Sequence, residues 1–268
     1  MTMRDDLNLV RHLGTLVRHR ELLARMIHRE ISSRYRQTFL GMAWSFIKPM
    51  ATVGVFTVIF SGIAKLPSER IPYPLFFMAG LMPWTMLSAA VTSGISSLTG
   101  QSNLVTKIVF PREILPLASV AASVMDLAIA LLCLIGLMVG FRVAPTWNAL
   151  YALPILAVEV LLTVGVTLIL SLANVWYRDI TQAAGLLLQL WMFLTPVLYP
   201  AGAIPAKYRA LCSLNPMTGI IEGFRSAVIK GRPPEAGPLA LSFGISLVIF
   251  VGGYAVFKLF EPRLADVI

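Results

Sequence analysis

Residues 71–106 read IPYPLFFMAGLMPWTMLSAAVTSGISSLTGQSNLVT, a run of 36 residues without a charged side chain. About 20 consecutive apolar residues are enough to cross the hydrocarbon core of a bilayer as a helix. The whole chain has the same character, because 57% of its residues are hydrophobic and only 13% are charged, whereas about 25% of the residues in a soluble domain are charged. The sequence therefore predicts an integral membrane protein.

Other apolar runs on both sides of this stretch extend the prediction to six transmembrane segments. Because lipid offers the backbone no hydrogen-bonding partner, each segment is expected to be a helix that satisfies its own polar groups. The predicted fold is an all-α, polytopic bundle. The chain then divides into a cytoplasmic amphipathic segment, 1–38, and a transmembrane domain, 39–268. The six predicted spans are residues 39–64, 73–97, 114–141, 151–177, 180–199 and 239–257.

The distribution of charge predicts how the bundle is oriented in the cytoplasmic (inner) membrane. Residues 1–48 contain nine Lys or Arg and four acidic residues, whereas the next loop, 65–72, has only Lys65 and Arg70 as basic residues. The positive-inside rule therefore places the amino terminus in the cytoplasm, and six spans return the carboxyl terminus there. The first 38 residues also lack the apolar core of a cleavable signal peptide. The net charge of +9 indicates contact with anionic membrane lipid rather than with nucleic acid, because no nucleic-acid-binding module is recognisable.

Two segments outside the predicted spans have the pattern of short helices at the membrane surface. Between residues 7 and 31, apolar side chains recur at helical spacing with arginines between them, which predicts an amphipathic interfacial helix. Such a helix could anchor the chain to the membrane, form a contact surface for a cytoplasmic partner, or do both. In the inner loop 103–116, Pro111 fits a first helical position, so a short helix before it and a charged knob at the inner surface are expected.

The outer segment 201–238 is predicted to form a re-entrant helix. Its apolar run, 216–229, is too short to cross a bilayer. Asn215 is a favourable amino-terminal cap, and Pro216 suits the first helical position. Within the run Glu222 and Arg225 are three residues apart and can pair, and Gly231 can close the carboxyl end.

Four stretches together resemble a known family of proteins. They are residues 34–41 (RYRQTFLG) with Trp44 and Pro49, residues 110–113 (FPRE) with Leu115 and Pro116, residues 177–180 (YRDI), and Asn215-Pro216 followed by Glu222 and Arg225. The chain resembles the permease subunits of ABC type-2 exporters that move lipid-linked polysaccharide, including O-antigen, capsule and teichoic acid. The resemblance implies six spans, a homodimer with a channel between the protomers, an interface helix, a coupling helix before the third span, and paired short helices in the last outer loop.

The resemblance also implies a division of labour between subunits. The chain contains no Gly-x-x-x-x-Gly-Lys-[Ser/Thr] phosphate loop, and the family pairs two permeases with two separate ATP-binding cassette subunits. The chain is therefore expected to be a transport subunit that is not an enzyme and has no cofactor of its own. Arg112 and Glu113 could alternatively mark only the membrane boundary. The residues expected to couple the permease to the ATPase are Lys107, Phe110, Pro111, Arg112, Glu113, Arg29, Arg34 and Arg36.

Polar and aromatic residues inside the predicted spans are candidates for contact with a transported glycan. Asp126 and Glu159 are expensive to place in a bilayer, so each indicates either a polar passage or a pairing, for example with Ser123 or Thr163, that pins the bundle. Trp44, Trp84 and Trp191 lie away from the span ends. An indole presents an apolar face to the C–H face of a sugar, so these three are candidate channel-lining residues.

The remaining motif residues are assigned gating or structural roles. Tyr177, Arg178 and Asp179 suit a tight inner turn in which the arginine and the aspartate pair. The outer residues in the same class are Asn215, Pro216, Glu222 and Arg225.

Two other functions stay open at this point. A membrane enzyme acting on lipid-linked sugars would need clustered acids or histidines, but all three histidines lie in the amino-terminal segment and no paired-carboxylate motif occurs. An ion-coupled carrier could use Asp126 and Glu159 as relay groups, although no inverted repeat is evident. No metal site is predicted. Gly136 and Gly140 form a weak small-x-x-x-small pattern for helix contact.

Overall fold

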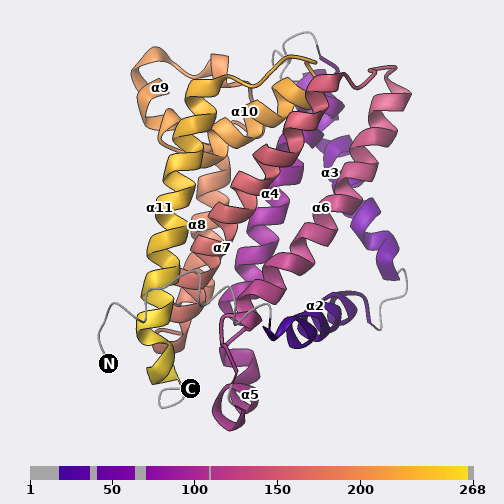
Figure 1. Ribbon diagram of the computed structural model, residues 1–268. Coiled ribbons are helices and arrows are strands. Elements are labelled where there is room, and N and C mark those ends of the chain that lie inside the picture. Colours follow the sequence, from indigo (N-terminus) through magenta and orange to yellow (C-terminus); the bar gives the residue numbers. More distant parts are fainter. Residues whose placement is uncertain (1–17, 37–40, 64–70, 109, 265–268) are drawn as a thin grey trace.

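The computed structural model describes residues 18–36, 41–63, 71–108 and 110–264 (Figure 1). Every regular element within these ranges is helical, which confirms the all-α fold. Residues 1–17 and 37–40, which belong to the predicted amino-terminal segment and to the RYRQTFLG stretch, lie outside the described residues. The long helices are α3 (Trp44–Thr57), α4 (Tyr73–Ile95), α6 (Ile114–Gly140), α7 (Ala152–Trp176), α8 (Ile180–Leu194) and α11 (Ala236–Phe260).

Five helical segments in the described chain are long and apolar enough to cross a membrane. They make the chain a multi-pass membrane protein. The observed helices lie close to the predicted spans, apart from the first, where α3 is preceded by a 3₁₀ turn and continues as a π-helix. The five segments are Trp44–Ile63, Tyr73–Ile95, Ile114–Gly140, Trp147–Trp176 and Ala236–Arg263.

The helix observed at the predicted span 180–199 is shorter than the prediction. Helix α8 has 15 residues, which at 1.5 Å per residue is about 22 Å, less than the hydrocarbon core of about 30 Å. The helix ends because Pro196 disfavours a helical conformation in the residue before it, and Thr195 is extended with ψ 139°. The sixth membrane crossing therefore stays a prediction.

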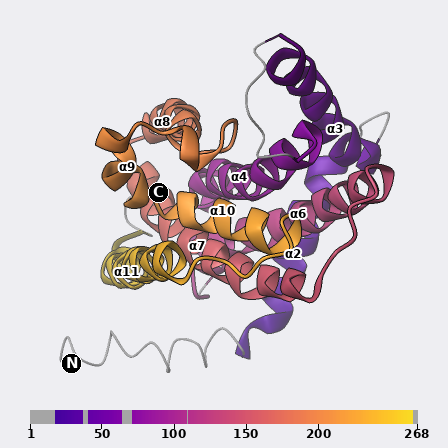
Figure 2. The ribbon, with the colours of Figure 1, turned by 90° about the horizontal axis from the view of Figure 1, so that it is seen from above.

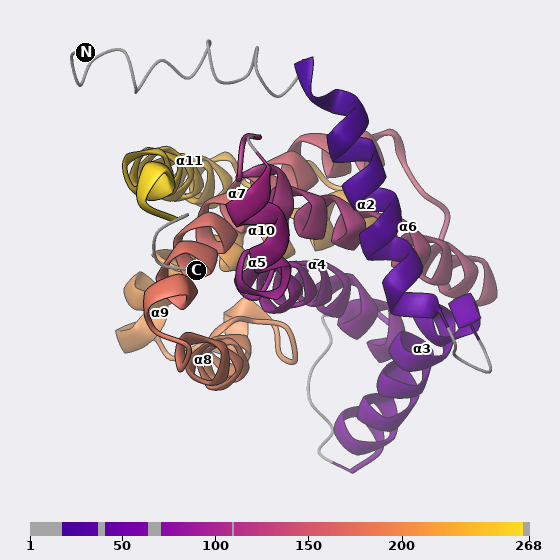
Figure 3. The ribbon, with the colours of Figure 1, turned by 90° about the horizontal axis from the view of Figure 1, so that it is seen from below.

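The short helices lie at the two ends of the bundle. Helix α2 (Arg20–Tyr35) lies across the axis of the bundle against α6, at the same end as α5 (Ser102–Lys107) and the end of α11 (Figures 1 and 3). Helices α9 (Ala206–Ser213) and α10 (Pro216–Val228) lie at the opposite end. The predicted amino-terminal helix, 7–31, is described only from residue 18 onward, where α2 covers 20–35. The short helix before Pro111 and the short helix after Asn215 are present as the sequence predicted, and α9 completes the pair that the family resemblance implied.

Helix α4 lies at the centre of the bundle, where it packs against α3, α6, α7, α8 and α10 (Figure 2). Most of its side chains are buried, whereas only Val53 is buried in α3. The backbones of α7 and α11 lie in close contact, because a Cβ atom added at Gly165 would lie 2.7 Å from the backbone nitrogen of Phe250. Gly136 and Gly140 have no such neighbour within 4 Å in the described chain, so the small-residue contact that they suggested is not formed there.

Candidate functional site

A buried arginine holds α10 against the centre of the bundle. The Arg225 side chain is fully buried, and its Nη1 and Nη2 donate to the carbonyl oxygens of Pro196 and Val197, each at 2.6 Å. Its Nε donates to the carbonyl oxygen of Phe76 at 3.1 Å, and the guanidinium lies 3.7 Å from the centroid of the Phe76 ring. The predicted ion pair with Glu222 is confirmed at 2.9 Å. The arginine therefore connects α10 to α4 and to the segment after α8.

Asn215 caps α10 as the sequence predicted. Its Oδ1 accepts from the backbone nitrogen of Met217 at 3.1 Å, and Pro216 occupies the first helical position. The same Oδ1 accepts from the indole nitrogen of Trp191 at 3.0 Å, and the Trp191 ring meets Trp84 edge-on at 5.7 Å between centroids. Trp84 is buried. These two indoles support the end of the bundle where α9 and α10 lie, and their contact with a transported molecule stays a prediction.

A groove of about 940 Å³ opens between α2, α3, α4 and α6. Trp44 lies at its edge with 39% of its surface exposed, and the Lys48 ammonium lies 5.9 Å from the indole centroid. Of the residues predicted to contact substrate, Trp44 and Asp126 line this groove. The hydroxyl groups around it belong to Ser45, Thr52, Thr85, Ser88, Thr92 and Ser93.

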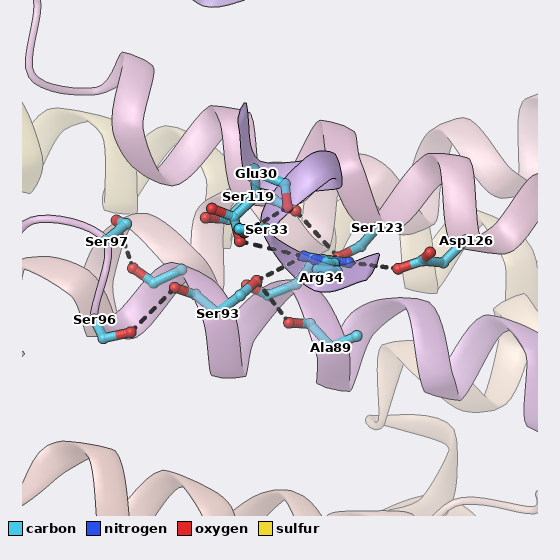
Figure 4. Close-up of polar contacts among 12 residues, drawn as sticks. Glu30, Ser33, Arg34, Ala89, Ser93, Ser96, Ser97, Ser119, Ser123 and Asp126 are labelled. Carbon is cyan, nitrogen blue, oxygen red and sulfur yellow. Dashed lines mark hydrogen bonds and ion pairs between the residues drawn. The ribbon is translucent and has the colours of Figure 1, made fainter. Parts of the chain in front are cut away.

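Arg34 connects α2, α4 and α6 beside this groove (Figure 4). Its Nη1 forms an ion pair with the Asp126 carboxylate, and its Nη2 donates to the hydroxyls of Ser93 at 3.0 Å and Ser123 at 3.3 Å. Glu30, one turn earlier in α2, lies 3.7 Å away. Asp126 is therefore paired, but with an arginine of the interface helix. Arg34, which the sequence assigned to ATPase contact, faces the bundle, whereas Arg29 and Arg36 are exposed.

Glu159 is not among the residues that line the groove. It is fully buried in α7, and neither carboxylate oxygen has a hydrogen-bond partner among the described residues. The Thr163 hydroxyl donates to the backbone carbonyl of Glu159 at 2.8 Å and not to its side chain. The predicted pairing with a helix hydroxyl is thus absent from the described structure.

In the loop that follows α5, Arg112 and Glu113 contact the end of α11 and do not project into solvent. Glu113 is fully buried and pairs with Lys258, while the Tyr254 hydroxyl donates to Glu113 Oε1 at 3.1 Å. The Arg112 backbone nitrogen donates to Glu261 Oε1 at 2.8 Å. Burial raises the pKa of Glu113, and the nearby Lys258 ammonium acts in the opposite direction. The expected charged knob is therefore limited to the exposed end of α5, which includes Lys107, while Phe110 and Glu113 are buried.

Residues 177–179 form the tight inner turn that the sequence predicted. The Ile180 backbone nitrogen donates to the Tyr177 carbonyl at 3.1 Å, and α8 begins directly after Asp179. The expected ion pair between Arg178 and Asp179 is not formed among the described residues. Adjacent residues at a helix start point in different directions, which explains its absence.

The sequence from α2 to α10 matches a known transporter family. Residues 21–229 match the family ABC2_membrane, described as ABC-2 type transporter. The chain belongs to this family.

Individual relatives of this ABC-2 type transporter are similar over nearly their full lengths. The O-antigen export system permease protein RfbA of Myxococcus xanthus is 30% identical over 258 residues, which cover 95% of this chain and 97% of the relative. An RfbA protein of Klebsiella pneumoniae is 25% identical over 92% of this chain and 95% of its own length. The polysialic acid transport protein KpsM of Escherichia coli is 22% identical over 88% of this chain and 92% of its own length.

Several residues of this ABC-2 transporter's site could not be found from sequence spacing, because only the tertiary structure brings them together. Tyr254, Lys258 and Glu261 lie after the matched region and carry no motif, yet they hold the inner loop. Lys48 lies within α3, and only the structure shows that it lines the groove. A lysine inside an apolar span was the available signal, because such residues usually face a cavity or a partner.

Replacing Arg34 with Met is expected to loosen α2 from the rest of this ABC-2 transporter. Hydrogen bonds to charged groups contribute about 1.5–3 kcal/mol, so amide exchange along α2 should become about tenfold faster or more. Hydrogen-exchange mass spectrometry of the protein in lipid nanodiscs measures this. Arg25→Met is the matched control, because Arg25 is exposed on the same helix and should leave exchange unchanged. Equal protection of α2 in both variants would contradict an anchoring role for Arg34.

Proposed function

We propose that this chain is the membrane-spanning permease subunit of an ATP-driven exporter that moves lipid-linked polysaccharide across the cytoplasmic membrane. The observation that carries the proposal is the similarity, over nearly the full length, to proteins named as O-antigen export permeases. The similarity to a polysialic acid transport protein supports a polysaccharide cargo more generally. Both termini are proposed to lie in the cytoplasm, in keeping with the basic amino-terminal segment.

The permease is proposed to work as a homodimer with two ATP-binding cassette subunits. The absence of a phosphate loop from the sequence supports a separate ATPase. The exposed surface of α2, which includes Arg25 and Arg29, and the exposed end of α5 lie at one end of the bundle and suit contact with such a partner. The groove is open on one side of the single chain, and a second copy would provide the other wall of a channel.

The groove between α2, α3, α4 and α6 is proposed to contact the sugar-phosphate part of the cargo. The Trp44 indole offers an apolar face for a sugar ring, and the surrounding hydroxyls can exchange hydrogen bonds with sugar hydroxyls. Lys48 and Arg34 are donors for phosphate oxygens. These groups come from α2, α3 and α4, and α6 completes the lining, so the groove would respond to movement of any of the four helices.

Replacing Trp44 with Ala is expected to lower polysaccharide export by about three- to tenfold, since aromatic contacts contribute about 0.5–1.5 kcal/mol beyond area burial. The measurement is surface polysaccharide per unit of membrane-inserted protein, in cells that lack the chromosomal copy and carry the variant. Trp147→Ala is the matched control, because Trp147 is 89% exposed and lies outside the groove. Equal export by both variants would remove Trp44 from cargo contact.

The function itself is tested by reconstitution of the wild-type chain. Lipid-linked polysaccharide should cross proteoliposome membranes only when the chain is assembled with its ATP-binding subunits and ATP is supplied. Transport at full rate by the chain alone, driven by an ion gradient, would overturn the proposal in favour of a carrier. Chemical turnover of a lipid-linked sugar by the chain alone would overturn it in favour of an enzyme.

A further inference from the structure

An ion cluster joins the inner loop to the carboxyl-terminal end of α11. Lys258 bridges two acidic residues, Glu113 at the start of α6 and Glu261 at 2.9 Å. Arg112 binds Glu261 through its backbone nitrogen and through its guanidinium, which donates to the Glu261 carbonyl. The two halves of the cluster are 145 residues apart in the sequence, so the cluster holds distant segments of the chain together.

The centre of this cluster is shielded from water. The Glu113 side chain is fully buried and that of Lys258 is 7% exposed, and the Tyr254 hydroxyl occupies the second oxygen of Glu113. Charge pairs in such surroundings are weakly screened by salt. Removal of one partner leaves the other charge buried and uncompensated, which is far less favourable than loss of a surface pair. The loop cannot separate from α11 without exposing these charges.

From α11 the contacts continue toward the outer end of the bundle. Gly165 of α7 lies against the backbone of Ile249 and Phe250, and a Cβ at Gly253 would lie 2.7 Å from the Gly165 carbonyl oxygen. Farther along, Ser242 Oγ and the Pro238 carbonyl lie directly against Gly219 of α10. These are contacts between backbones or short side chains, so α11 cannot shift along its axis without displacing α7 and α10.

We propose that Tyr254, Lys258 and Glu261 are positioning residues that clamp the inner loop to α11, so that displacement of the loop by the ATPase moves α11 and, through it, α7 and α10. The inference rests on the proposed function and adds the route by which the loop acts on the outer end. Exposed residues of α5, including Lys107, remain available for contact with the ATPase. Arg112 and Glu113 then transmit force within the permease instead of binding the partner.

The test uses the full complex of permease and ATP-binding subunits in proteoliposomes, and measures polysaccharide exported per ATP hydrolysed. Lys258→Met should lower this ratio by about tenfold, within the usual range of coupling between sites, while the amount of assembled complex stays the same. Lys258→Arg keeps the charge and should retain most of the ratio. Arg263→Met is the matched control, because Arg263 is an exposed cation at the same end whose guanidinium lies over the Phe260 ring.

A further variant keeps the test decisive if Lys258→Met fails to assemble. Glu113→Gln removes the buried negative charge with little change of shape and should also lower the ratio. A wild-type ratio in both Lys258→Met and Glu113→Gln would overturn the clamp, as would proportional losses of export and ATP hydrolysis in Lys258→Met that Lys258→Arg does not recover. A wild-type complex without ATP-dependent export would instead overturn the proposed function.

Discussion

Replacing Arg225 with Met is expected to destabilise the outer end of the bundle by about 3–5 kcal/mol, the range seen when a buried charged partner is removed. Three carbonyl groups, those of Phe76, Pro196 and Val197, would lose their donor in a buried place. Each unsatisfied buried acceptor is unfavourable by about 1–3 kcal/mol before relaxation. Glu222 would keep only Lys230, at 3.6 Å, as an ion-pair partner. We therefore expect α10 to detach from α4.

The experiment is thermal unfolding of the purified protein in detergent, together with its yield from membranes. Arg225→Lys should lie between wild type and Arg225→Met, because an ammonium keeps the charge but cannot direct donors to several carbonyls in the geometry of a guanidinium. Arg232→Met is the control just after the same helix, since Arg232 is exposed. A melting temperature of Arg225→Met within one or two degrees of this control would show that α10 is held by apolar packing alone.

Gly80 explains how the arginine reaches these carbonyls. A Cβ atom at this position would lie 2.3 Å from Arg225 Nη2 and 3.1 Å from the Val197 carbonyl oxygen. Only a residue without a side chain leaves space for the guanidinium beside the backbone of α4. The position of the buried arginine therefore depends on a glycine 145 residues earlier in the sequence.

The features that the sequence predicted well are those determined by neighbouring residues. The lengths of the apolar runs identified the helices. The helix start depends on Asn215 and Pro216, and the ion pair joins Glu222 to Arg225, so each feature involves residues at most three positions apart. The shorter α8 was missed because run length counts apolar residues across Pro196, although the proline ends the helix.

The intrachain partners of the charged site residues depend on helix arrangement. Arg34 meets Asp126 across 92 residues, and Glu113 meets Lys258 across 145. Composition shows that each charge at the membrane needs a partner, but many partners are possible and only the tertiary structure selects one. Arg34 and Glu113 were both predicted to couple the permease to the ATPase, and the structure adds an intrachain ion-pair partner for each, while the coupling role stays a prediction.

The close contact of α7 with α11 is another feature that the sequence could not predict. A substitution at this contact is the second one for which we expect a large loss of stability. The sequence suggested helix contact at Gly136 and Gly140, which are four residues apart in one helix, but the structure uses one glycine from each of two helices. Gly165 and Gly253 allow the backbones of α7 and α11 to touch. Small residues at helix crossings have this role in membranes, where van der Waals packing drives association. No spacing rule within one helix can reveal such a pair.

Replacing Gly165 with Ala is therefore expected to force α7 and α11 apart and to destabilise the protein by about 1–3 kcal/mol, as overpacking usually does. The added Cβ would lie 2.7–2.8 Å from three backbone atoms of Ile249 and Phe250, and backbone cannot rotate away as the end of a side chain can. Gly165→Leu should be worse. Gly136→Ala is the control, because a Cβ atom there would have no atom of another described segment within 4 Å, and the better helix propensity of alanine should leave it neutral or slightly stabilising. Thermal unfolding in detergent compares the three variants. Equal melting temperatures for Gly165→Ala and Gly136→Ala would mean that the two helices are free to separate, and the route from α11 to α7 would lose its rigid contact.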